Sequence, residues 1–278
     1  MKCYDCPRKC GVDRKSQKGF CGESDKIRVA KVIENFAWEE PCISGEKGAL
    51  AIFFSGCNLR CEFCQNYKLS HVGYGDEYSP KKFRAWLEKI DLDKYSCIDL
   101  ITPSHFSSAL IEALKDFDCP IPIVWNSSGY ESEEMIEKLA KVVDVFLPDF
   151  KYYSSELSFR FSKSKDYFDV ASKAIKKMST LKKNIFSNGQ MIEGVLIRHL
   201  VLPGFKDDSI KILEFIHNEI NNPYISLMSQ FTPTKGDIKR KLFPLEYKIV
   251  LSHADKLGLK NGYIQEFESA SDDFIPEF

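Results

Sequence analysis

Residues 49–64 of the chain read ALAIFFSGCNLRCEFC. Residues 49–54 are all apolar, which predicts a buried strand, and a loop with three cysteines follows directly. Gly56 allows the chain to turn sharply off the strand. The thiolates of Cys57, Cys61 and Cys64 can each bind one iron of a [4Fe-4S] cluster, which leaves the fourth iron open for a substrate. A structural zinc knuckle is the alternative, but structural zinc takes four closed ligands and this loop offers three.

Regular patterns continue on both sides of this stretch. Apolar runs predict strands at residues 27–33, 49–54, 97–101, 121–125, 142–147, 194–202, 224–228 and 263–267. Helical patterns fall at residues 80–90, 107–115, 131–141, 167–181, 207–220 and 245–257. Strands that alternate with helices predict a parallel sheet.

The expected fold class is α/β. We predict a partial (β/α)6 TIM-like barrel with an irregular cysteine-rich N-terminal extension. Residues 1–47 would form the metal-binding extension, and residues 48–278 would form the barrel domain. Functional groups should then lie at the carboxyl ends of the strands.

The three-cysteine loop resembles that of the radical S-adenosylmethionine (AdoMet) superfamily. Within it, residues 48–233 are most similar to the pyruvate formate-lyase activating enzymes and to a related branch with a CxxCPRxC prefix. The resemblance implies that the open iron chelates AdoMet and that an electron from the cluster cleaves its sulfonium C–S bond. The resulting 5′-deoxyadenosyl radical then abstracts hydrogen. Phe63 matches an aromatic position that packs near the adenine, unless it only anchors the loop.

Three expected strand ends resemble further segments of the activating enzymes. Residues 124–129 (VWNSSG) resemble their Asp-Thr-Asn-Gly, and residues 145–151 (VFLPDFK) resemble their Asp-x-Lys. Residues 196–204 (LIRHLVLPG) match their Ile-Arg-x-x-Val-x-Pro-Gly pattern. The resemblance therefore places AdoMet-binding groups in all three segments.

Zwitterionic AdoMet needs cations for its carboxylate and oxygens for its ammonium and ribose. Arg198 can supply a planar fork, and Lys151 can supply a point charge. Asn126, Ser127 and Asp149 can supply oxygens. The alternative is internal pairing, because a buried charge needs a partner. Arg198 would then bind a barrel carboxylate, and Asp149 would bind Lys151.

One segment departs from the family pattern. Radical AdoMet enzymes usually carry Gly-Gly-Glu after the second barrel strand, whereas residues 101–106 read ITPSHF. Thr102 or Ser104 can supply oxygens in its place. His105 is either an acid or base, or a helix-capping or core residue.

Three residues outside these motifs have more than one possible role. Gln230 and Phe231, after the sixth barrel strand, either face the substrate or pack. Cys42 lies between the two cysteine groups, where it is a spare ligand, a substrate-facing residue or a structural cysteine.

A second cysteine group precedes the barrel. Cys3, Cys6, Cys10 and Cys21 provide four thiols within a short segment, which is what a metal site needs. Zinc and a second [4Fe-4S] cluster are both compatible. A closed four-thiolate site favours zinc, whereas an iron–sulfur cluster would act as an electron relay.

Composition narrows the remaining choices. The 278 residues carry a net charge of -1, so no strong field attracts nucleic acid or a membrane surface. No stretch is apolar enough to span a bilayer, and the first ten residues lack a secretory signal, so we expect a cytoplasmic protein. Ten cysteines would stay reduced there, and seven of them fall in two groups, which favours metal over disulfides.

Three functions compete. The resemblance favours a radical AdoMet enzyme that activates a glycyl radical enzyme, with flavodoxin or ferredoxin as electron donor. The ITPSHF departure and the extra cysteines favour modification of a small molecule or of another protein residue. The third possibility, a non-catalytic metal-binding module, leaves the strand-end cofactor groups without a use.

Overall fold

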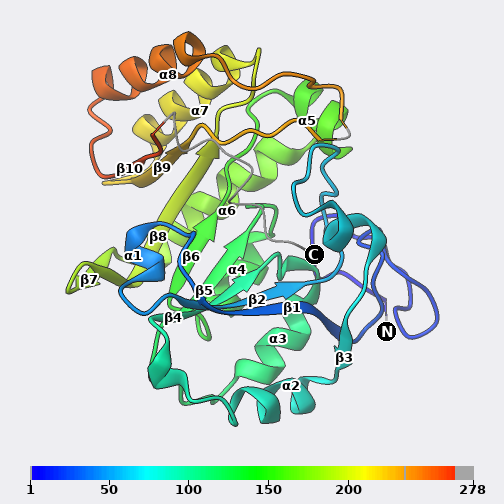
Figure 1. Cartoon of the computed structure of the whole chain (residues 1–278). Helices are drawn as coiled ribbons and strands as arrows, with labels where there is room; N and C mark the ends of the chain where they lie inside the picture. The colour runs from blue at the N-terminus through cyan, green and yellow to red at the C-terminus, as the bar shows by residue number, and fades with distance from the viewer. Residues whose placement is uncertain (1, 235, 267–278) are drawn as a thin grey trace.

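The structure is a computed structural model that describes residues 2–234 and 236–266. Its centre is a sheet of ten strands in the order β10-β9-β8-β6-β5-β4-β2-β1-β3, with β7 paired to β8 (Figure 1). The strands are β1 (Ile27–Phe36), β2 (Ala49–Phe54), β3 (Asp76–Tyr78), β4 (Cys97–Ile101), β5 (Ile123–Ser127), β6 (Val145–Pro148), β7 (Ile185–Ser187), β8 (Gln190–Leu200), β9 (Tyr224–Met228) and β10 (Gly262–Ile264). In this sheet order, each adjacent pair of strands between β10 and β2 is parallel. The short β7 pairs antiparallel with β8.

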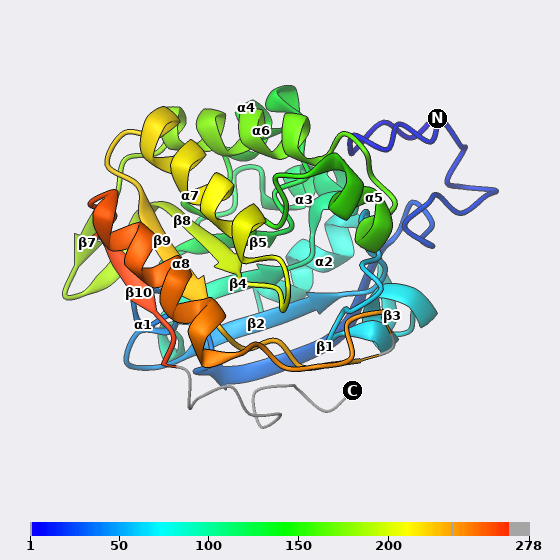
Figure 2. The ribbon, with the colours of Figure 1, turned by 90° about the horizontal axis from the view of Figure 1, so that it is seen from above.

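Helices connect the parallel strands and cover the sheet (Figures 1 and 2). They are α1 (Pro41–Ser44), α2 (Pro80–Leu87), α3 (Ser107–Leu114), α4 (Glu133–Leu139), α5 (Ser155–Ser162), α6 (Tyr167–Leu181), α7 (Lys206–Glu219) and α8 (Pro244–Lys256). Single helical turns occupy Lys68–Val72, Leu92–Lys94 and Ser104–Phe106. Because the strand order follows the chain from β2 to β9, each helical connection joins neighbouring strands.

The central strands are buried on both faces. Every residue of β2, β4, β5 and β6 is buried. Parallel strands covered on both sides read as continuous apolar runs, which is why sequence pattern alone located them. Trp125 and Phe146 are completely enclosed and anchor the core between sheet and helices.

The expected fold class is confirmed: the parallel strands form an open sheet like a partial TIM barrel. The expected strands and long helices are also present, although the α1 and α5 helices and the β3 and β7 strands were missed. These four are short or exposed, so they carry little periodic signal. β10 ends at Ile264, and position 267 of the strand expected at 263–267 lies outside the described residues.

The N-terminal extension is mostly irregular, as expected, but its last part joins the sheet. β1 pairs antiparallel with β2, and β3 pairs antiparallel with β1. A division between residues 47 and 48 stays a prediction. In the described part of the chain, no helix combines the length and apolar character needed to cross a bilayer.

Candidate active site

A cavity of about 270 Å³ opens where the parallel strands end. The loops after β2, β4, β5, β6 and β9 line it, together with the end of β8. Carboxyl ends of parallel strands meet at one edge of a sheet, so residues far apart in sequence converge there. All three loop cysteines line the cavity, and the predicted cofactor-binding residues that also do so are Phe63, Thr102, Asn126, Ser127, Asp149, Lys151 and Arg198.

The cysteine loop leaves β2 at Gly56, whose φ of 80° favours glycine. The Cys57 sulfur accepts hydrogen bonds from the backbone amides of Leu59 (3.3 Å) and Arg60 (3.4 Å). The Cys61 sulfur accepts one from the hydroxyl of Ser162 at 3.0 Å. Donors aimed at sulfur orient thiolate ligands and tune a bound metal.

A [4Fe-4S] cluster fits this donor set. Burial raises the pKa of the Cys57 thiol to about 12 and also raises that of Cys64, so a bound cation has to hold these groups as thiolates. Among the described residues, no three His, Cys, Asp or Glu side chains are placed to hold a single metal ion. A cubane takes each cysteine on a separate iron, so its ligands do not need to converge on one point.

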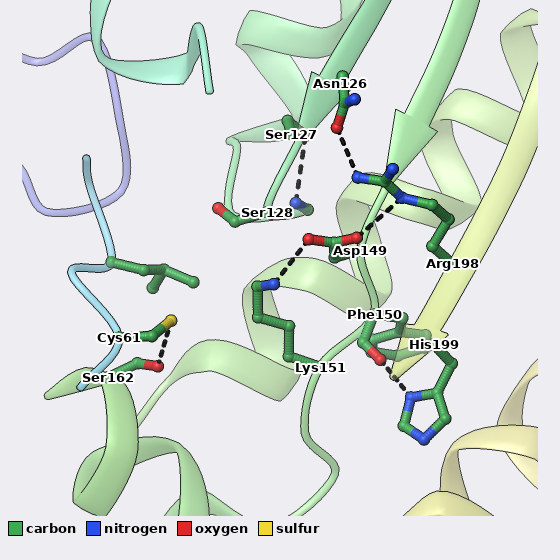
Figure 3. Close-up of polar contacts among 12 residues, drawn as sticks. Cys61, Asn126, Ser127, Ser128, Asp149, Phe150, Lys151, Ser162, Arg198 and His199 are labelled. Atoms are coloured by element: carbon green, nitrogen blue, oxygen red, sulfur yellow. Dashed lines mark hydrogen bonds and ion pairs between the residues drawn. The ribbon is translucent and has the colours of Figure 1, made fainter. Parts of the chain in front are cut away.

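A polar network faces the cysteines across the cavity (Figure 3). The guanidinium of Arg198 donates to Asp149 Oδ1 at 3.0 Å, to Glu39 Oε2 at 2.6 Å and to Asn126 Oδ1 at 2.6 Å. Lys151 Nζ donates to Asp149 Oδ2 at 2.6 Å. Both internal pairings that the sequence left open are therefore present.

Electrostatics keeps Asp149, Lys151 and Arg198 charged. Burial would raise the pKa of Asp149, but Lys151 and Arg198 hold it below its usual range. Burial likewise opposes the charge on Lys151 and on Arg198, yet the neighbouring carboxylates raise both pKa values. Arg198 has five N–H donors, so hydrogens remain for a ligand beyond its three protein partners. The site thus presents two fixed cations.

Sequence reasoning missed two carboxylates in the network. Glu39 lines the cavity from the segment after β1, and Asn126 Nδ2 donates to both Glu39 and Asp99 at 3.2 Å. Burial, together with the charge of Glu39, raises the pKa of Asp99 well above its usual value. Asp99 stands inside the apolar run CIDLI, and a charged residue in a buried strand is itself a signal of an internal polar partner.

Thr102 and Ser104 have different surroundings. Thr102 lines the cavity with a φ of 62°, an uncommon conformation for a β-branched residue. Ser104 is 1% exposed, and its hydroxyl donates to Glu131 instead. Phe63 lines the cavity and also packs against Phe161 and Phe231, with ring centroids 5.7 Å apart in each pair.

The structure locates the residues whose roles the sequence left undecided. His105 is 1% exposed, and its Nε2 lies 2.6 Å from the carbonyl oxygen of Ser55, which makes it a core residue below the loop. Gln230 and Phe231 both line the cavity. Cys42 is completely buried in α1, as expected of a structural cysteine.

Fold and site together define a class of protein: an open (β/α) barrel with three thiols and a charged network around one cavity at its strand ends. Residues 51–216 match the profile of the Radical SAM superfamily. An uncharacterized protein of Methanocaldococcus jannaschii is 33% identical over 92% of this chain and 75% of its own length. The chain belongs to the radical SAM superfamily, which implies S-adenosylmethionine and a [4Fe-4S] cluster as cofactors.

Solved structures support the fold assignment. SuiB of Streptococcus suis, solved with S-adenosylmethionine, has a TM-score of 0.54 at 14% identity over 78% of this chain. A radical SAM methyltransferase of Sphaerobacter thermophilus has a TM-score of 0.53 at 12% identity, over 80% of this chain and 68% of that one. The chain spans about half (50%) of the SuiB chain. At these identities the likeness concerns the fold alone.

Proposed function

We propose that this protein cleaves AdoMet reductively in the cavity and uses the 5′-deoxyadenosyl radical to remove a hydrogen atom from a glycine of a partner protein. One observation carries the proposal: Cys57, Cys61 and Cys64 line the same cavity as the cations Lys151 and Arg198. The cavity thus brings ligands for a cluster together with groups complementary to the AdoMet carboxylate.

The cysteines, the cations and the apolar rings that line the cavity have different roles. Cys57, Cys61 and Cys64 would hold the cluster, which when bound supplies the electron that cleaves the AdoMet C–S bond. Lys151 and Arg198 attract the carboxylate of AdoMet. The apolar rings around the loop exclude water, which protects a reactive radical from side reactions.

The remaining polar groups orient the ligand. Thr102, Asn126 and Ser127 offer oxygens for the ammonium and ribose groups, and Phe63 offers a ring face near the adenine. Thr102 lies in the segment that departs from the Gly-Gly-Glu pattern of the family. Its hydroxyl and the Glu39 carboxylate take the place of the missing acidic residue.

Cavity size supports a macromolecular substrate. About 270 Å³ lies just below the range for small-molecule pockets, roughly 300–1,000 Å³. AdoMet would occupy most of this space, so the substrate hydrogen has to enter at the mouth, where Trp38 keeps 45% of its surface exposed. An extended polypeptide can place one of its residues in the mouth of the cavity. SuiB, which shares the fold, has also been solved with a precursor peptide bound.

Deuterium transfer tests the proposal. Cells of the source organism are grown with glycine deuterated at Cα, and their anaerobic extract is separated by size. The protein, a reductant and AdoMet are then added to each fraction. We expect deuterium in 5′-deoxyadenosine and a persistent protein radical by electron paramagnetic resonance (EPR), both in the macromolecular fraction. Cys61→Ala serves as the inactive control.

Modification of a small molecule or of another protein residue is the second candidate. The observation in its favour is Thr102, which belongs to the departing ITPSHF segment and lines the cavity itself. Deuterium transfer from the low-molecular-mass fraction, without a persistent protein radical, would favour the small molecule and contradict glycyl radical formation.

A further inference from the structure

The N-terminal segment folds back on itself at its cysteines. The amide of Gly11, next to Cys10, donates to the carbonyl oxygen of Cys3 at 3.1 Å, and the charges of Cys21, Cys3 and Cys10 act on the Cys6 thiol. Gly19 lies between two of them: a Cβ atom there would be 3.2 Å from the Cys10 sulfur and 3.4 Å from the Cys21 sulfur. Glycine at this position lets both sulfurs approach the same backbone segment.

Backbone amides point at these sulfurs in a repeated pattern. Burial raises the pKa of Cys3, Cys6 and Cys21, and the backbone amides of Asp5, Arg8 and Glu23, respectively, oppose this rise as donors. Each donor lies two residues after its cysteine, and Leu59 stands in the same relation to Cys57 in the loop. Such amide–sulfur bonds support metal-bound thiolates.

The N-terminal group also touches the cluster loop directly. The backbone amide of Cys57 donates to the carbonyl oxygen of Cys21 at 3.3 Å. Arg8 Nε donates to the carbonyl oxygen of Asn58 at 2.8 Å. One hydrogen bond therefore joins a ligand of one group to a ligand of the other.

On its far side, the N-terminal group reaches the surface. Cys3 and Cys10 are half-buried, as is Cys64 in the loop, whereas Cys6, Cys21, Cys57 and Cys61 are all buried. Residues 2–22 contain six basic and two acidic residues, although the whole chain has a net charge of -1. Four of the basic residues are exposed lysines: Lys2, Lys9, Lys15 and Lys18. Figure 2 shows this segment projecting at one edge of the molecule.

We propose that Cys3, Cys6, Cys10 and Cys21 bind a second iron–sulfur cluster, which passes electrons from an acidic donor protein to the cluster at Cys57, Cys61 and Cys64. The proposal of a metal site does not depend on the proposed function, whereas the relay role rests on it. The N-terminal group touches the cluster loop at Cys21 and Cys57 and carries exposed lysines, so it offers a path for electrons to the loop cluster. Its lysines complement an acidic partner and would steer its approach.

The electron balance is simple. The donor is oxidised by one electron, the N-terminal cluster carries that electron, and the loop cluster is reduced by it. No bond or proton changes on the way. Zinc, which ligand count alone favoured, is redox-inert and would leave the Cys21–Cys57 contact without an electron-transfer role.

Metal analysis tests the site independently of any activity. In the anaerobically purified Cys57→Ala/Cys61→Ala/Cys64→Ala variant, we expect about four irons with equal sulfide and no zinc. Wild-type protein should hold about eight irons and show two distinct reduced signals by EPR. One zinc per chain in either protein, or a folded triple variant without metal, would overturn the proposal. The wild-type count decides the matter if the triple variant does not fold.

Donor kinetics tests the relay. With pre-reduced flavodoxin at low salt, Lys9→Glu/Lys15→Glu/Lys18→Glu should slow 5′-deoxyadenosine formation about ten-fold or more, while dithionite-driven formation stays unchanged. The control reverses the exposed lysines Lys173, Lys183 and Lys248 on and beside α6 and α8. Equal flavodoxin-driven rates in both triple variants would overturn the docking role.

Discussion

The two cysteine groups of this protein differ in how they are held. The loop at 57–64 follows a fully buried strand and lies among the ends of six parallel strands. The group at 3–21 lies on a segment with little regular structure, attached by side-chain and backbone hydrogen bonds. The sheet places the loop, whereas the N-terminal segment is held by its contacts with the loop and, in our proposal, by a bound cluster. Rigid placement suits bond cleavage, and a peripheral position suits electron entry.

The largest expected effect is the loss of AdoMet cleavage when a cysteine of the loop at 57–64 is replaced. Changing Cys57, Cys61 or Cys64 to Ala should abolish AdoMet cleavage with every reductant, because two cysteines do not hold a cubane in place. The half-buried Cys119, which belongs to neither group, supplies the control Cys119→Ser. Anaerobic assay of 5′-deoxyadenosine measures the result. Wild-type activity in any loop variant would remove that cysteine from the ligand set.

Arg198→Ala should weaken AdoMet binding by about 1.5–3 kcal/mol, the range for a hydrogen bond to a charged group. That corresponds to a roughly ten- to hundred-fold higher dissociation constant. The substitution also leaves Glu39 and Asp149 without their shared partner. Isothermal titration of the anaerobic protein measures the dissociation constant, with Arg84→Ala as control, because Arg84 on α2 is half-buried and does not line the cavity. Unchanged affinity in a folded variant would make Arg198 purely structural.

Gly56→Ala probes the contact between the two groups. A Cβ atom there would lie 2.5 Å from Cγ of Glu23 and 2.7 Å from the Cys21 carbonyl oxygen, both in the N-terminal segment, at a φ of 80°. Gly189 has a φ of 82° and nothing within 4 Å of its Cβ position, so Gly189→Ala isolates the backbone cost. We expect Gly56→Ala to lower the free energy of unfolding by about 1–3 kcal/mol more than the control. Equal values by chemical denaturation would mean that the contact is loose.

Glu39→Gln should have the smallest effect, a change in how the stability of the folded protein depends on pH. Burial raises the pKa of Glu39 to about 7, although Arg198 opposes this. The folded protein then holds a proton that the unfolded chain releases, so the stability from this group is full below about pH 4.5 and is lost as pH rises through 7. Thermal unfolding from pH 5 to 8 should show a shallower decline in Glu39→Gln than in wild type or Glu134→Gln. Parallel curves in all three would contradict the shift.

Sequence reasoning found the parts of the fold and site that repeat a pattern. Buried parallel strands give continuous apolar runs, and the motifs that end them carry Asn126, Asp149 and Arg198 to one edge. Glu39 was missed because it follows β1, outside the barrel repeat, and only the three-dimensional fold brings it to Arg198. Ser104 stands in the expected motif, but the turn directs its hydroxyl to Glu131, and it is not among the residues that line the cavity.

Contact between the two cysteine groups was also beyond sequence reasoning. The position of Cys21 beside Cys57 depends on how an irregular segment folds over the loop, for which no periodic signal exists.

The most direct test of the central claim is AdoMet cleavage by the anaerobically reconstituted wild-type protein with dithionite. We predict that 5′-deoxyadenosine and methionine form in equal amounts, and that both disappear in Cys61→Ala. Intact AdoMet in the presence of a reduced cluster, or equal product from Cys61→Ala, would contradict the assignment of radical chemistry to the cavity.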